Sequence, residues 1–547
     1  MACRMLMKAD VTSAPTRADT RHTKLIRLAR NAASADTNVV LESRGVVLVV
    51  GDDATVVPHA TRLAASLKVV MCAPGAQDAL GLPRSVRSLG GRIVSITGRM
   101  GAFTARAATS RDDSADIGAF GPNPDRTFDL VLDLSRTPHL REAVPPLGYF
   151  APGGSAGAIA EALAILPTLV GRFAKPRYFE YAADLCTHGA QGFSGCSRCI
   201  DVCSTAAIAS ARDRVVVDPY LCQGCANCTL ACPTGALSFK AVTRGDVLAR
   251  CAQAINAARD EGVAQPVLVA REARDAREEN QPALPNAART LDLPALASFG
   301  EEIWFAALAQ GAAAVVLVAD ESLEPVTRDL VTKRVELARE VLAAVGTRPE
   351  RIILAAPEEL AAVLSVAASA VRSDSRAAVP NPRSTKRTLM LAAIDTVSSG
   401  RPLGPRALPI GAPFGEVIVD RARCTLCRAC VNLCPTQALT ASDDRGPRLS
   451  FVEANCVQCG LCEAGCPEQA ITLNPRFVAD AAQRSSARVL HADSLARCTS
   501  CDTPFMPAKL LALNIARMKD FPGLDDRGGV ERLKLCPACR QRAVLDA

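Results

Sequence analysis

The sequence predicts a multidomain protein of mixed α+β and α/β class, in which two small α/β domains alternate with cysteine-rich modules. The 547 residues exceed what a single core organises, because domains commonly span roughly 100–200 residues. Short apolar runs of strand length alternate with helical stretches in two separate regions of the chain. Twenty-three cysteines gather mostly in three blocks. They are too sparse for a disulfide scaffold and too many for thiols that only pack, so most are expected to bind metal.

Composition and charge exclude several classes of protein. Apolar residues make up 49% of the chain and charged residues 22%, as is typical of a soluble globular protein. The net charge of +7 is modest for this length and does not indicate a nucleic-acid binder. No run of about 18 apolar residues occurs, so no membrane span is expected. The basic tail expected at residues 1–44 lacks the apolar core of a signal peptide, which predicts a cytoplasmic protein.

The first α/β domain is expected at residues 45–150. Gly45–Asp53 predicts a buried strand and Ala54–Leu67 a helix. Three further apolar runs of strand length follow, at residues 69–73, 92–97 and 128–134.

The second α/β domain is expected at residues 245–371, with a parallel sheet. Its predicted strands are residues 266–270, 313–319 and 351–355, and its predicted helices are residues 300–310, 324–344 and 358–371. The stretch 372–411, rich in Arg, Ser, Pro and Gly, predicts a linker.

A cysteine module at residues 412–475 contains two runs of identical spacing, C-x2-C-x2-C-x3-C-P. They comprise Cys424, Cys427, Cys430 and Cys434, and then Cys456, Cys459, Cys462 and Cys466. This spacing brings three thiolates to one iron-sulfur cube and directs the fourth to another cube. We therefore predict one 4Fe-4S cluster held by Cys424, Cys427, Cys430 and Cys466, and a second held by Cys456, Cys459, Cys462 and Cys434. The alternatives are a pair of zinc sites or buried inert thiols.

An earlier cysteine module, at residues 175–240, carries the same pattern with one deformed arm. Its complete run is Cys222, Cys225, Cys228 and Cys232, and its deformed run is Cys186, Cys196, Cys199 and Cys203. A glycine-rich loop, Thr187–Gly195, is inserted after the first cysteine of the deformed run. Its glycines are expected to let backbone amides approach the cluster sulfurs closely. Cross-ligation predicts one cluster held by Cys186, Cys196, Cys199 and Cys232, and another held by Cys222, Cys225, Cys228 and Cys203. A three-iron or damaged site at the Cys186 arm is the alternative.

Both modules resemble the dicluster ferredoxins of bacteria, down to the tails Cys222–Leu237 and Cys434–Leu439. The resemblance implies two electron-relay modules with the ligand sets just given. The stretch Phe299–Ala355 is similar to the iron-sulfur subunit of methyl-viologen-reducing hydrogenases, but no cysteine occurs between Cys251 and Cys424. That similarity implies a docking or scaffold domain without a cluster of its own. The whole arrangement resembles multi-cluster ferredoxin-type proteins found beside formate dehydrogenases.

The third cysteine block, at residues 490–547, predicts a zinc-ribbon-like module. Two C-x2-C pairs, separated by a predicted helix at Ala508–Lys519, offer four thiolates to one tetrahedral ion: Cys498, Cys501, Cys536 and Cys539. We expect structural zinc here. The alternatives are rubredoxin-like iron, a fifth cluster or free thiols.

Other signals predict no further site. Gly153-x-Ser155-x-Gly157 matches the nucleophile elbow of hydrolases, but a turn precedes it where a strand is required. His188 is expected in a surface loop, with a hydrogen bond to a cluster sulfur as the alternative. The lone cysteines, Cys3, Cys72 and Cys251, are expected to pack or to lie at the surface.

The expected function is single-electron transfer through four 4Fe-4S clusters, to or from a partner oxidoreductase of dehydrogenase or hydrogenase type, with formate dehydrogenase as the candidate. No catalytic residue set lies beside the cysteines. One alternative is an iron-sulfur assembly or redox-sensing scaffold for a client oxidoreductase. Another is an enzyme with a flavin bound within residues 45–150.

Overall fold

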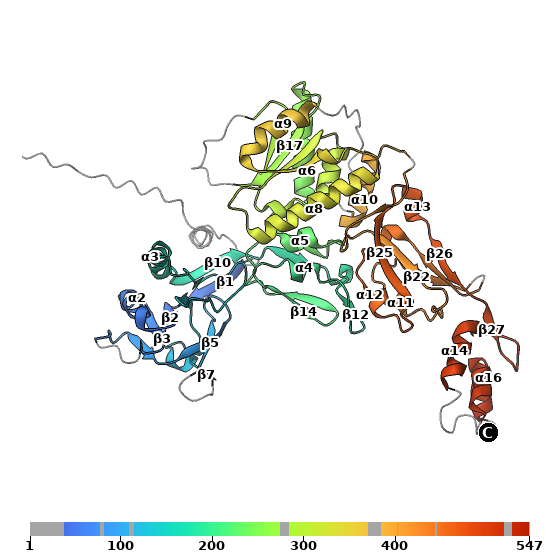
Figure 1. Cartoon of the computed structure of the whole chain (residues 1–547), viewed down its shortest axis with the longest axis horizontal. Coiled ribbons are helices and arrows are strands. Elements are labelled where there is room, and N and C mark those ends of the chain that lie inside the picture. Colours follow the sequence, from blue (N-terminus) through green and yellow to red (C-terminus); the bar gives the residue numbers. More distant parts are fainter. Residues whose placement is uncertain are drawn as a thin grey trace, which may run out of the picture. The chain divides into compact units, whose positions relative to one another are not determined.

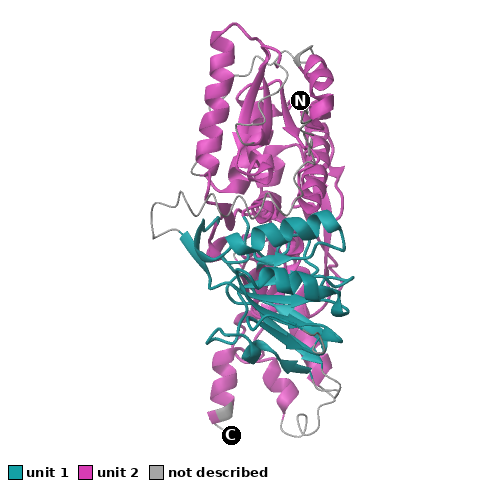
Figure 2. Cartoon of the chain, turned by 90° about the vertical axis from the view of Figure 1, so that its left-hand side faces the viewer, with its two compact units in different colours: residues 1–178, 204–207, 217–223 teal, residues 179–203, 208–216, 224–547 magenta. Residues whose placement is uncertain are grey.

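The computed structural model describes residues 38–76, 81–108, 114–273, 284–369, 384–401, 403–443, 446–518 and 528–545 (Figure 1). Most of the predicted basic tail, and Cys3 with it, lies outside these residues. The chain forms two compact units (Figure 2). The first comprises residues up to 178 together with 204–207 and 217–223, and the second comprises the remainder.

The first unit is built on a parallel sheet with the strand order β4-β3-β2-β8-β9. Its strands are Lys68–Cys72 (β3), Val86–Leu89 (β4), Val46–Val50 (β2), Leu130–Asp133 (β8) and Tyr149–Phe150 (β9). Every residue of the central strand β2 is buried, as expected for a parallel strand with both faces covered. The helix predicted after β2 begins as the 3-10 turn Ala54–Val56 and continues as α2 (Val57–Leu63), which contacts β3.

The apolar run at residues 92–97 forms a strand, but in a different sheet. It is β5 (Arg92–Thr97), which pairs antiparallel with β6 (Thr104–Ala108), followed by β7 (Ser114–Asp116). The first unit also continues beyond the predicted boundary at residue 150. It adds α3 (Ala156–Ile165) and the ribbon of β1 (Asn38–Ser43) with β10 (Gly171–Pro176), so strand β1 occupies the end of the predicted tail.

The second unit contains the predicted parallel sheet, in the order β18-β17-β19-β20. The strands are Ala288–Leu293 (β18), Val267–Glu272 (β17), Ala314–Val318 (β19) and Ile352–Ala355 (β20). Its helices are Arg244–Asp260 (α6), Glu301–Ala309 (α7), Pro325–Ala344 (α8) and Leu360–Ser369 (α9). All nine residues of α7 are buried, which agrees with its unbroken apolar sequence after two glutamates. The sequence did not predict β18, in which three polar residues interrupt the apolar ones.

The stretch predicted as a linker contains a packed helix, α10 (Lys386–Val397). Seven of its residues are buried, and it packs along α7. A short strand, β21 (Arg406–Ala407), follows. The basic residues at the start of α10 made the segment resemble a linker, yet they are among its buried residues.

The cysteine-rich parts of the second unit are made of short helices and small antiparallel sheets. The helices are Arg198–Asp201 (α4), Asn227–Ala231 (α5), Ala429–Asn432 (α11), Leu461–Ala464 (α12) and Ala481–Ser485 (α13). The paired strands around the first module are Phe179–Tyr181 (β11) with Leu237–Phe239 (β16), Gly189–Ala190 (β12) with Phe193–Ser194 (β13), and Ile208–Ala211 (β14) with Arg214–Val217 (β15). Those around the second module are Gly415–Val419 (β22), Leu439–Ser442 (β23), Arg448–Phe451 (β24), Ile471–Phe477 (β25) and Arg488–Ala492 (β26).

The C-terminal segment comprises a hairpin and three helices. These are Leu495–Arg497 (β27), Pro504–Pro507 (β28), Ala508–Met518 (α14), Gly529–Leu533 (α15) and Pro537–Leu545 (α16). The helix predicted between the two C-x2-C pairs is therefore present as α14. Across the described residues, no helix combines the length and apolarity that crossing a membrane requires.

Candidate metal centres

The four cysteine runs share left-handed turns that the spacing of the cysteines does not reveal. In each complete run, the residues on both sides of the second cysteine have positive φ, a conformation that is uncommon outside glycine. These pairs are Gly224 and Ala226, Leu426 and Arg428, and Gln458 and Gly460. The deformed run has no such pair, because its loop is inserted at that point. All four runs nevertheless close with a left-handed residue three positions after the last cysteine: Ala206, Gly235, Gln437 and Gln469.

One cavity of the second module is lined by cysteines from both of its runs. Its volume is about 480 Å³, and its cysteines are Cys424, Cys427, Cys430 and Cys466. Burial, together with the charges of the other three, raises the pKa of Cys430 to about 12. Such thiols ionise readily only when a positive centre displaces the proton. The donor set and its surroundings therefore fit an iron-sulfur cluster.

The other four cysteines of the second module also interact across the two runs. Burial raises the pKa of Cys462, and the neighbouring charges of Cys456, Cys459 and Cys434 raise it further. Cys434 belongs to the first run of this module, yet its charge acts on the three cysteines of the second run. This grouping fits the ligand set predicted by cross-ligation.

The deformed arm of the first module surrounds a second cavity, of about 330 Å³. Its lining includes Cys186, Cys196, Cys199 and Cys232, which is the predicted set. Burial, then the charges of Cys196, Cys232 and Cys186, raises the pKa of Cys199 to about 12. Burial opposes ionisation of Cys232, but the Lys386 ammonium and nearby hydrogen-bond donors outweigh it and lower the Cys232 pKa.

His188 lies at the wall of this cavity and is buried, so its prediction as a surface-loop residue is wrong. Its Nδ1 lies 2.8 Å from the carbonyl oxygen of Cys196, and its Nε2 lies 2.7 Å from Oγ of Ser210. Both ring nitrogens are thus engaged with oxygen atoms. The histidine braces the inserted loop and makes no hydrogen bond to a sulfur.

The last predicted set consists of Cys203, Cys222, Cys225 and Cys228. All four are half-buried. Cys222 belongs to the first compact unit and the other three to the second. Their joint ligation of a cluster stays a prediction.

Two adjacent basic residues lie in the stretch predicted as a linker. Both are buried against the two modules. Lys386 donates to the carbonyl oxygens of Thr229 (2.9 Å) and Leu230 (3.1 Å), at the end of α5, which carries Cys228. Arg387 donates to the carbonyls of Ala454, Pro413 and Cys456 at 2.6–2.8 Å. Burial lowers the pKa of Arg387 to about 10, against the opposing charge of Cys456. Cations at these carbonyls stabilise a helix end and a cysteine loop.

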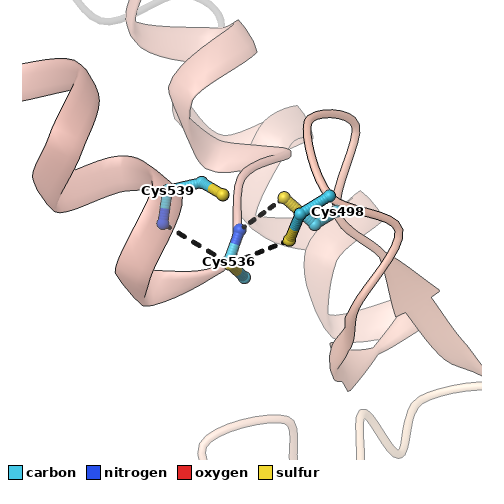
Figure 3. A group of neighbouring side chains, drawn as sticks. Cys498, Cys536 and Cys539 are labelled. Atoms are coloured by element: carbon cyan, nitrogen blue, oxygen red, sulfur yellow. Dashed lines mark hydrogen bonds between the residues drawn. The ribbon is translucent and has the colours of Figure 1, made fainter.

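The C-terminal cysteines converge on one point. The sulfurs of Cys498, Cys501, Cys536 and Cys539 all lie within 4.8 Å of one another. The amide of Cys536 donates to Sγ of Cys498 (3.2 Å), and the amide of Cys539 donates to Sγ of Cys536 (3.5 Å; Figure 3). Burial opposes ionisation of Cys498, but backbone amides outweigh it and lower its pKa to about 6.

The spacing of these sulfurs favours a single metal ion. Sulfurs bound tetrahedrally at about 2.3 Å lie about 3.8 Å apart, and Sγ of Cys501 lies 3.7 Å from Sγ of Cys536. A cube would separate its cysteines more widely, because each binds a different iron. The site therefore fits one tetrahedral ion, and its assignment to zinc stays a prediction.

Metal analysis of the full chain should find about one zinc in addition to the cluster iron, because four thiolates close a tetrahedral site. Replacing Cys498 and Cys501 together by serine should remove that zinc and expose residues 495–547 to protease, since metal binding stabilises such small modules. The visible spectrum of the clusters should stay unchanged. Recovery of iron in place of zinc from a preparation supplied with both metals would contradict the assignment.

The remaining signals have structural roles. Ser155 caps α3, and its Oγ accepts a hydrogen bond from the Ala158 amide (3.4 Å). Cys72 in β3 and Cys251 in α6 are buried, and burial raises their pKa values to about 11 and about 12. Both therefore pack as apolar residues.

Comparison with known families identifies both cysteine modules. The family of 4Fe-4S dicluster domains matches residues 177–236 and 423–470. No curated protein matches the chain. The chain thus carries two ferredoxin-type regions and has the character of a multi-cluster iron-sulfur protein.

Proposed function

We propose that this protein relays single electrons through four 4Fe-4S clusters to or from a partner oxidoreductase. The observation that supports this most directly is the cavity whose cysteines come from two runs, Cys424, Cys427 and Cys430 from one and Cys466 from the other. That exchange of the fourth cysteine characterises the two-cluster pattern. Each bound cluster supplies reversible one-electron chemistry.

The chain's own residues would bind, shield and position these centres. The sixteen cysteines of the two modules supply the thiolates. Buried cations from α8 and α10 keep the cysteine loops in place: Arg334 donates to the carbonyls of Leu230 (3.2 Å) and Ala231 (2.9 Å), beside the contacts of Lys386. We assign the parallel-sheet domain that carries α8 and α10 a scaffold role on this basis. The C-terminal zinc module would dock a partner.

A formate dehydrogenase is our candidate partner, by resemblance to proteins found beside such enzymes. The test is anaerobic co-purification of the full chain from its source, followed by kinetics with the oxidoreductase that accompanies it. The visible absorption of a relay should begin to fall within one turnover of that enzyme when substrate is added, because its clusters become reduced. Reduction much slower than turnover would contradict the relay and favour the scaffold or redox sensor. A flavin absorption spectrum would favour the alternative of an enzyme with a bound flavin.

A further inference from the structure

The two cysteine modules of the second unit touch at a glycine. A β-carbon at Gly195 would lie 2.7 Å from Cγ of Leu461 and 3.1 Å from the carbonyl oxygen of Cys459, so no larger residue fits without separating the loops. The next residue, Cys196, is a predicted ligand of the first module, and Cys459 is one of the second. Cys196 lies close enough for its charge to contribute to the raised pKa of Cys459, after burial and the charges of Cys456 and Cys434.

Arg198 spans the same contact. Its Nη1 lies 3.6 Å from Sγ of Cys196 and donates to the carbonyl of Val457 (3.2 Å). Its Nη2 donates to the carbonyls of Gln458 and Gly411, both at 3.2 Å. These acceptors are three neutral carbonyls and one cysteine sulfur, so no carboxylate among them cancels the charge of the guanidinium.

Arg387 adds a second cation at the second module's loop. It is buried, stacks 4.7 Å from the ring centroid of Phe414, and directs its hydrogen bonds to carbonyls, including that of Cys456. The charges of Arg484 and Arg198 act against the charge of Arg387, and those of Cys456 and Glu453 favour it. Two like charges held together are costly unless a negative group lies beside them.

We propose that single electrons cross between the modules at this junction (Gly195, Cys196 and Arg198 with Val457, Gln458 and Cys459), and that Arg198 and Arg387 favour the reduced form of the two centres beside it. This inference rests on the proposed function. One electron, supplied by the redox partner, leaves one centre and arrives at the other, and no bond is made or broken. Each added electron is a negative charge, which nearby cations and hydrogen bonds to sulfur stabilise.

The first test isolates the junction in the full chain. The two centres at the junction, to which Cys196 and Cys459 belong, are the inner centres, and the other two are the outer centres. The double variant Cys225→Ser/Cys427→Ser removes one ligand from each outer centre and should leave about eight iron atoms, in the two inner centres. Paramagnetic resonance of the reduced protein should then show a magnetic interaction between these two centres. Adding Gly195→Val should weaken it, because the loops must separate. Adding Ser194→Val, at the exposed neighbouring position, should leave it unchanged.

The second test measures reduction potentials without removing any ligand. Arg198→Gln should lower the equilibrium constant for one-electron reduction of an inner centre about tenfold. This corresponds to a fall of about 59 mV in its reduction potential. Arg428→Gln is the matched control, since Arg428 adjoins Cys427 in an outer set and is already paired with Asp443. It should leave the inner potentials unchanged.

Absence of the magnetic interaction in the double variant would contradict electron transfer at this junction. Equal shifts of the reduction potentials in Arg198→Gln and Arg428→Gln would contradict it as well. If the double variant loses more iron than expected, the potential measurements decide. Iron content and reduction by the partner are measured on the unaltered chain. If the junction tests fail while the iron content and the reduction by the partner are as expected, only the junction is contradicted and the proposed relay function is not.

Discussion

Replacing Cys434 by serine should lower the iron content of the anaerobically reconstituted chain from about 16 atoms to about 12. The lost cluster should be that of Cys456, Cys459 and Cys462, although Cys434 belongs to the other run in the sequence. The reason is cross-ligation: the charge of Cys434 acts on the thiols of Cys459 and Cys462. Paramagnetic resonance, combined with iron and acid-labile sulfide analysis, measures both effects.

The control for this variant is Cys251→Ser, which alters a buried thiol that lies in no run. It should retain all of the iron. Loss of the cluster of Cys424, Cys427 and Cys430 in Cys434→Ser would mean that each run serves its own cube. An iron content of eight or fewer atoms in the unaltered, fully reconstituted chain would contradict the presence of two dicluster modules.

The elements that the sequence predicts best are those with a strong local signal. The helix α8 was predicted to within about a residue, and the strand predicted at Gly45–Asp53 forms as Val46–Val50, because a helical period and an unbroken apolar run leave little choice of structure. The strand β5 was predicted as a strand but belongs to an antiparallel sheet, since pairing depends on distant partners. Strand β18 was missed because only three of its six residues are buried and two polar residues stand side by side within it.

The cysteine positions in the candidate site followed from spacing, but the residues that brace them did not. Lys386 and Arg387 follow a stretch of Ser, Pro and Arg that is typical of an exposed linker. Nothing local distinguishes them from solvated side chains, because every acceptor except the carbonyl of Pro413 lies more than sixty residues away. The role of Gly195 is only weakly signalled by the sequence. Glycines were expected in the inserted loop to let amides approach sulfur, whereas the Gly195 amide donates to the carbonyl of His188 (2.7 Å), and its missing side chain makes room for the other module.

Lys386→Met should destabilise the first cysteine module by about 3–5 kcal/mol, because removing one partner of a buried ion pair leaves the other uncompensated. The ammonium lies 3.7 Å from the Glu302 carboxylate, and both side chains are at most 6% exposed. Its hydrogen bonds to the end of α5 are lost as well. A chain of several domains does not unfold in one step, so the readout is hydrogen exchange of the α5 amides in the full protein, where protection should fall about a hundredfold or more.

The matched control is Lys333→Met in α8, which removes an exposed ammonium 2.8 Å from Asp329. Exposed pairs of this kind contribute about 1 kcal/mol or less, so protection of α5 should be retained. The double variant Lys386→Met/Glu302→Gln separates charge from packing. If the cost arises from the unpaired carboxylate, neutralising Glu302 should restore part of the lost protection, giving a coupling between the two sites. Equal losses in the single and double variants would instead assign the cost to the missing hydrogen bonds at Thr229 and Leu230, and full protection in Lys386→Met would contradict the role of α10 as a brace.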